Sequence, residues 1–90
     1  MLANRERVID VNVTDLSFAQ QCINIYRINR GVYNTIDQWF YENGEREIKQ
    51  RRILILDFLH NFFENDIEKH KFGKGGLSTA LDHYYKGIHY

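Results

Sequence analysis

The stretch EREIKQRRILILDFLHNFFENDIEKH, residues 45–70, decides the fold. Apolar residues recur in it at the three- and four-residue spacing of a helix, and its acidic first turn suits the positive end of a helix dipole. We therefore expect one long central helix over 45–70. Its apolar surface spreads well beyond an ordinary stripe, which indicates burial on more than one side.

Shorter helices are expected before and after this segment, because capping residues flank further runs of helical spacing. They run from Leu16 to Arg30-Gly31 after an N-cap at Thr14 or Asp15, from Asn34-Thr35 to Asn43-Gly44, and from Ser78 to a stop at Gly87. The residues Val8 to Val13 alternate between apolar and polar types, which predicts a short strand or an extended arm.

Together these elements predict an all-α fold, a small bundle of about four helices around one long central helix. Ninety residues suffice for a single domain, 1–90. Within it we expect a flexible segment at 1–7 and a glycine-rich hinge at 71–76.

The composition narrows the function classes. Twelve Lys and Arg balance twelve Asp and Glu, so a chain-wide electrostatic footprint for nucleic acid is absent. Cys22 is the only cysteine and lies in an apolar run, where we interpret it as a buried small hydrophobe. Neither a signal peptide nor a membrane span is visible, and the expected location is the cytoplasm.

Sites for small-molecule chemistry are weakly supported. The segment Gly73 to Thr79 resembles a phosphate-binding loop only superficially, because Thr79 stands where the second lysine is needed. Asp66 and His70 form half of a metal-ligand set without a second pair, and no nucleophile is spaced with a base. We therefore expect no enzyme activity, no metal and no cofactor.

The broad apolar face of the central helix favours a protein partner, most simply a second copy of the chain. Arg52 and Asp66 each lie seven residues from Leu59, so they would meet across an antiparallel helix pair. The aromatic-rich segment 83–90 would extend this surface. The expected interface residues are Leu54, Ile55, Phe58, Leu59, Phe62, Arg52, Asp66, Tyr84 and Tyr85.

The sequence thus predicts a small non-enzymatic regulatory or adaptor protein, a homodimer that acts through protein–protein contacts. The composition would suit an accessory protein of a phage or mobile element. The alternative is a DNA-binding transcriptional regulator with a basic helix start and a lysine-bearing loop. Its candidate nucleic-acid contacts are Arg46, Lys49, Arg51, Arg52, Lys71 and Lys74.

Overall fold

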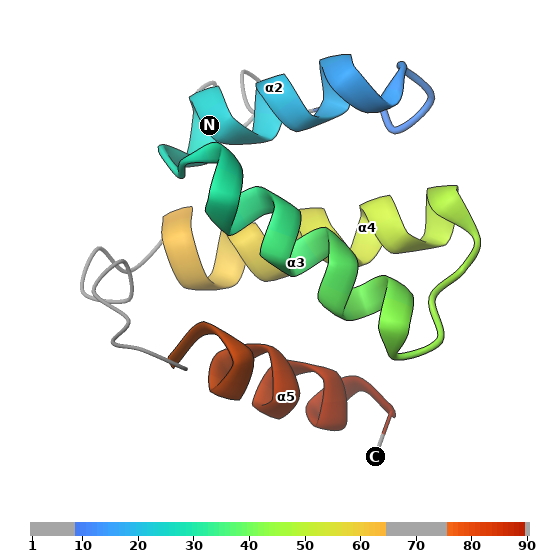
Figure 1. The fold of residues 1–90 in the computed structure, drawn as a ribbon, viewed down its shortest axis with the longest axis vertical. Coiled ribbons are helices and arrows are strands. Elements are labelled where there is room, and N and C mark those ends of the chain that lie inside the picture. Colours follow the sequence, from blue (N-terminus) through green and yellow to red (C-terminus); the bar gives the residue numbers. More distant parts are fainter. Residues whose placement is uncertain (1–8, 65–75, 90) are drawn as a thin grey trace, which may run out of the picture.

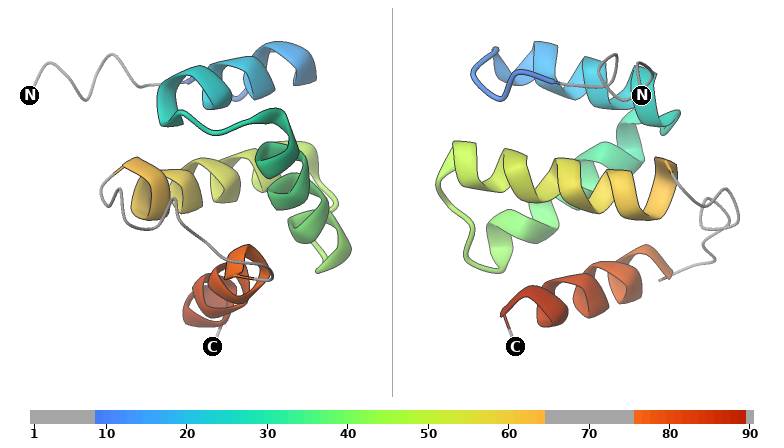
Figure 2. Two further views of the ribbon diagram at one scale, coloured as in Figure 1. Left: turned by 60° about the vertical axis from the view of Figure 1, so that its left-hand side comes forward. Right: turned by 180° about the vertical axis from the view of Figure 1, so that it is seen from behind.

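The computed structural model describes residues 9–64 and 76–89, and all regular structure in these two ranges is helical. Its elements are α2 (Asp15–Tyr26), α3 (Arg30–Glu42), α4 (Ile48–Leu59), the π-helical turn η1 (His60–Glu64) and α5 (Gly76–His89). α3 crosses α4 in the middle of the molecule, with α2 on one side and α5 on the other (Figures 1 and 2). The predicted all-α bundle is confirmed.

A single long helix over 45–70 is not confirmed. Glu47 is the N-cap of α4, with its carboxylate accepting a hydrogen bond from the Gln50 amide at 3.0 Å, so Glu45 lies outside the helix. At His60 the α-helix gives way to η1. Residues 65–70 lie outside the described ranges, as do the predicted flexible segment 1–7 and the hinge 71–76.

The N-terminal strand is not formed over the described residues 9–13. Asp10 instead organises a turn: its carboxylate accepts from the Asn12 amide at 2.8 Å, and its carbonyl accepts from the Val13 amide at 3.2 Å. The predicted N-cap that follows is correct. The Thr14 hydroxyl accepts from the Ser17 amide at 3.1 Å and opens α2.

The boundaries of the other helices show which local signals were decisive. Asn29 caps α3 by accepting from the Val32 amide at 2.8 Å, so α3 starts several residues before its predicted start. Its end is as predicted, because Gly44 adopts φ 114°, a conformation that favours glycine. α5 continues through Gly87, since a glycine inside a helix lowers stability without forcing a stop.

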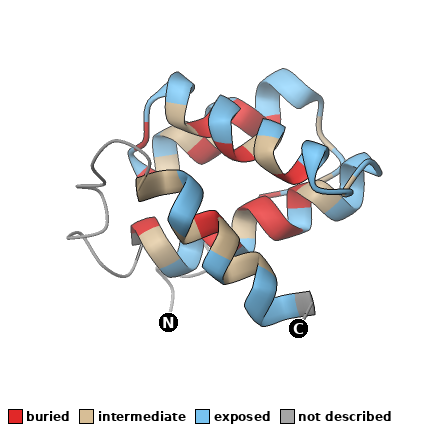
Figure 3. Ribbon diagram, turned by 60° about the horizontal axis from the view of Figure 1, so that its bottom comes forward, coloured by how far each residue is buried: buried red, intermediate tan, exposed pale blue. Residues whose placement is uncertain are grey.

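The core encloses most of the apolar face of α4 within the chain itself (Figure 3). Phe58 and Leu59 are fully buried, and Phe62 stacks on Phe58 with ring centroids 4.8 Å apart. Tyr84 packs edge-on against Phe58 at 5.4 Å. The other buried apolar side chains include Phe18, Ala19, Cys22, Ile36, Phe40, Leu54, Ile55, Phe63 and Leu81.

This packing corrects the predicted protein interface. Leu54, Ile55, Phe58 and Leu59 were expected to meet a partner, but α2, α3 and η1 already cover them. A small domain can bury the apolar face of α4 because each neighbouring helix contributes large aromatic side chains. Burial inside the chain removes the surplus apolar area on which the homodimer prediction rested.

Candidate nucleic-acid interface

Arg52 projects into the protein and is only 7% exposed. Its guanidinium donates to the carbonyl of Val13 at 2.6 Å and to that of Val11, and it pairs with the carboxylate of Asp15. It also lies 5.1 Å from the centroid of the Phe18 ring. Arg52 therefore holds the turn before α2 against α4 and is not a surface cation.

Arg52 does not have the role predicted for it, a contact with Asp66 of a second chain across an antiparallel helix pair. The donors of Arg52 are engaged within its own chain by Asp15 and by two backbone carbonyls. Asp66 lies outside the described residues. A buried guanidinium cannot leave these partners for another chain without losing several charge-assisted hydrogen bonds.

Arg51 is also anchored within the protein. Its Nε donates to Asp37 Oδ1 at 2.7 Å, and its Nη1 donates to the carbonyl of Glu45 at 2.9 Å. Glu47, four residues before Arg51, serves as the N-cap of α4. Arg51 thus ties α3 to the start of α4.

The remaining described basic residues of the candidate set, Arg46 and Lys49, are exposed. Arg46 donates from Nε to the carbonyl of Tyr41 at 3.0 Å, and its guanidinium carbon lies 4.7 Å from the centroid of the Tyr41 ring. Tyr41 itself is 43% exposed. We call Tyr41, Arg46 and Lys49 the basic corner, since they lie at the turn between α3 and α4. Lys71 and Lys74 lie outside the described residues.

The basic corner combines two kinds of group that contact single-stranded nucleic acid. Lys and Arg bind phosphate, and an aromatic ring or a guanidinium plane offers a surface on which a base can stack. The hydrogen bond to the Tyr41 carbonyl restricts the Arg46 side chain, so less entropy would be lost on binding.

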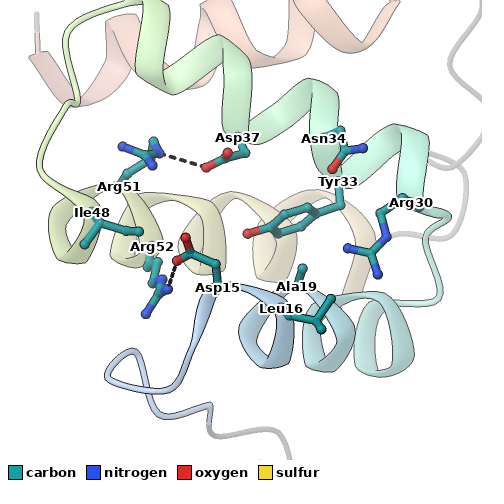
Figure 4. Close-up of a pocket in the computed structure, with 10 residues that line it drawn as sticks. All are labelled: Asp15, Leu16, Ala19, Arg30, Tyr33, Asn34, Asp37, Ile48, Arg51 and Arg52. Carbon is teal, nitrogen blue, oxygen red and sulfur yellow. Dashed lines mark hydrogen bonds and ion pairs between the residues drawn. The ribbon is translucent and has the colours of Figure 1, made fainter.

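A cleft of about 360 Å³ opens beside this corner, between α2, α3 and the start of α4 (Figure 4). We call it the polar cleft. Its sides carry the two anchored ion pairs, Arg51–Asp37 and Arg52–Asp15. The other lining residues are Leu16, Ala19, Arg30, Tyr33, Asn34 and Ile48.

Burial explains the shifted titrations among the described residues. It raises the pKa of the Cys22 thiol to about 12, with the charge of Arg52 acting in the opposite direction. The pKa of Tyr84 is raised by burial first and then by its hydrogen bond to Asp57, 2.5 Å away. Such protonated groups are poor nucleophiles.

The described ranges also bear on the metal-site, phosphate-loop and membrane expectations. Residues 9–64 and 76–89 contain no group of three His, Cys, Asp or Glu side chains able to hold a metal ion. The segment 73–75 of the phosphate-loop candidate and His70 lie outside these ranges. Within the same ranges, every helix is too short or too polar to span a membrane.

The chain is 44% identical over 80 residues to a protein of Bacillus subtilis (strain 168) named RNA-binding riboflavin kinase RibR. The aligned region covers 83% of this chain and 34% of that protein, so the chain spans about a third of the relative's length. No protein-family model matches the chain, and no solved structure matches it.

This similarity contradicts the interpretation of the chain as a regulatory or adaptor protein that acts through protein–protein contacts, and its interpretation as a DNA-binding transcriptional regulator. The related protein is named for RNA binding, which differs both from the action of an adaptor through protein–protein contacts and from DNA binding by a transcriptional regulator. The cluster of basic residues at the start of α4 was a local signal for nucleic-acid binding, but it did not indicate RNA, and the net charge of zero argued against it.

Proposed function

We propose that this chain is an RNA-binding domain. The observation that carries the proposal is the 44% identity, over most of the chain, to a protein named for RNA binding. Riboflavin kinase activity is a property of the whole relative, of which this chain spans about a third. RNA binding is the activity that a short helical domain can supply through surface groups alone.

The basic corner is the surface that we assign to RNA. Arg46 and Lys49 would neutralise phosphates, and the exposed ring of Tyr41 with its stacked guanidinium would receive a base. Arg51 supports the corner from inside, since its guanidinium lies 5.3 Å from the Tyr41 ring centroid. Arg51 and Arg52 are then positioning groups, with their charges already engaged by Asp37 and Asp15.

Fluorescence anisotropy with a labelled random single-stranded RNA of about 20 nucleotides tests the proposal. The chain should bind at low salt and lose affinity as salt rises, since each phosphate contact releases about 0.7 counterions from a single strand. The double variant Arg46→Gln and Lys49→Gln should weaken binding about ten-fold and lower the salt slope by about 1.4.

The matched control is Arg27→Gln. Arg27 is exposed and is the C-cap of α2, so it lies before the start of α3, whereas the basic corner lies at the end of α3. Arg27→Gln removes one positive charge where the double variant removes two. A loss of binding free energy half as large as that of the double variant would therefore show a general charge effect and contradict the assignment of the corner. Absence of binding by the unaltered chain at low salt would refute the RNA proposal itself.

A further inference from the structure

The polar cleft presents fixed hydrogen-bond acceptors. Asp15 and Asp37 each use one carboxylate oxygen for an arginine, and their side chains are still 76% and 38% exposed. A carboxylate has about four lone-pair sites, so both can accept further hydrogen bonds without releasing their arginines. The ion pairs hold the acceptors in place before any ligand arrives.

The charge of the cleft is compatible with a phosphate-bearing ligand. Arg30, Arg51 and Arg52 face two aspartates, so the lining carries one excess positive charge. Arg30 is exposed at the rim and its guanidinium is distant from both ion pairs (Figure 4). A ligand that brings both donors and a phosphate is therefore not repelled.

The cleft also has apolar edges and further polar groups. Leu16 is 69% exposed and Ile48 is 37% exposed, and together they offer surfaces on which a flat ring can lie. The Tyr33 hydroxyl points towards the aspartates, while Arg30 and Asn34 lie on the other side of its ring (Figure 4). A volume of about 360 Å³ falls at the small end of ligand pockets.

Among the RNA bases, guanine fits this arrangement best. Its Watson–Crick edge carries two adjacent donors, N1–H and the N2 amine, which one carboxylate can accept side by side. Its O6 and N7 are acceptors that suit Arg30 or the amide of Asn34. Uracil has a single donor on this edge, and adenine and cytosine have only their exocyclic amine.

We infer that the polar cleft binds the guanine base of an unpaired RNA nucleotide, with Asp37 accepting from N1 and N2 and Arg30 near its acceptors or its phosphate. This inference rests on the proposed RNA binding. It adds base selectivity to the basic corner, because Arg51 touches both the cleft and Tyr41. A single RNA strand could then run from the basic corner to the polar cleft.

The test uses three labelled RNA oligonucleotides that differ at one central position: an all-uridine strand, the same strand with guanosine, and the same strand with inosine, which lacks the N2 amine. The unaltered chain should bind the guanosine strand about ten-fold more tightly than the inosine strand, the range expected for one bidentate base contact. Asp37→Asn should remove this ratio, because the amide replaces an acceptor with a donor.

Asn34→Ala is the second variant, chosen because Asn34 is exposed and its change leaves the core intact. It should reduce the preference for guanosine over uridine while leaving the melting temperature unchanged. Equal affinity of the unaltered chain for guanosine and inosine strands would overturn the inference, even with strong RNA binding. Failure to bind all three strands would instead refute the proposed function.

Free GMP carries the same base edge and is titrated as a competitor. Competition by GMP only at concentrations far above that of the guanosine strand would support recognition within RNA. Competition by GMP at concentrations similar to that of the guanosine strand would overturn recognition within RNA, since the rest of the strand would then contribute nothing to the affinity.

Discussion

The inner and outer faces of α4 each carry one residue whose exposure is unusual for its type. The inner face carries Arg52, which is 7% exposed, and the adjacent outer position carries Ile53, which is 50% exposed. A charged residue is thus buried next to an apolar residue in water. Hydrophobic residues are often exposed on small proteins, but a buried arginine requires partners, and its partners explain the difference.

The partners of Arg52 are the carbonyls of Val11 and Val13, which no neighbouring strand reaches in the described residues. Carbonyls that are partly withdrawn from water need donors, and a guanidinium offers five. Adjacent helical positions differ by about 100°, so turning Ile53 inwards would withdraw Arg52 from these carbonyls. The comparison teaches that α4 is oriented by backbone hydrogen bonding as well as by apolar burial.

Removing an apolar inner residue should have the largest effect. Phe58→Ala should lower the free energy of unfolding by about 3–5 kcal/mol, because Phe58 is fully buried and its deletion leaves a cavity. Urea denaturation followed by circular dichroism gives the measurement. A loss below about 1 kcal/mol would show that the inner face is less tightly packed than the structure has it.

Removing the charged inner residue should cost somewhat less. We expect Arg52→Ala to destabilise the protein by about 2–4 kcal/mol, because two carbonyls and a carboxylate lose their donor. Lys49→Ala, on the outer face, is the matched control and should change stability by less than about 0.5 kcal/mol. Similar results for both variants would remove the distinction between the two faces.

Alkaline pH should weaken the core that the inner face meets. Burial raises the pKa of Cys22 from 9.0 to about 12, so the folded protein keeps a proton that the unfolded chain releases. Stability is therefore constant up to about pH 8 and falls as the pH rises through 9 towards 12, by on the order of 1 kcal/mol between pH 8 and pH 9.5. Unfolding of Cys22→Ala should show a flatter pH dependence over this interval, and an equal slope would contradict the assignment.

The smallest effect is expected on the outer face. Ile53→Lys should change the free energy of unfolding by less than about 0.5 kcal/mol, since half of the side chain is already in water. Chemical denaturation of the variant beside Arg52→Ala provides the contrast. A loss above about 1.5 kcal/mol would mean that Ile53 is covered in solution, which would contradict the exposure of the outer face.

Local signals in the sequence predicted part of this fold. The Thr14 cap, the end of α3 at Asn43-Gly44 and the all-helical class follow from residues within a few positions of each other. Arg52 could not be assigned in this way, because its partners lie 37 to 41 residues earlier in the chain. The strand prediction failed for the same reason, since the alternation up to Val13 reflects a turn held by that arginine.

The candidate site was predicted only in outline. The basic start of α4 was identified, but four cations of equal appearance proved to be two structural groups and two exposed ones. Tyr41 was missed because a single aromatic near a helix end has no periodic signature. The polar cleft was missed because α2, α3 and α4 each contribute to it, and no sequence spacing brings these segments together.

The contact between Arg52 and the turn that precedes α2 has a consequence for biosynthesis. Residues 11 and 13 are synthesised 39 to 41 positions before Arg52. Their carbonyls must stay hydrated until the third described helix has been made and has docked. Formation of this contact is thus delayed until α4 has been made, however early α2 folds.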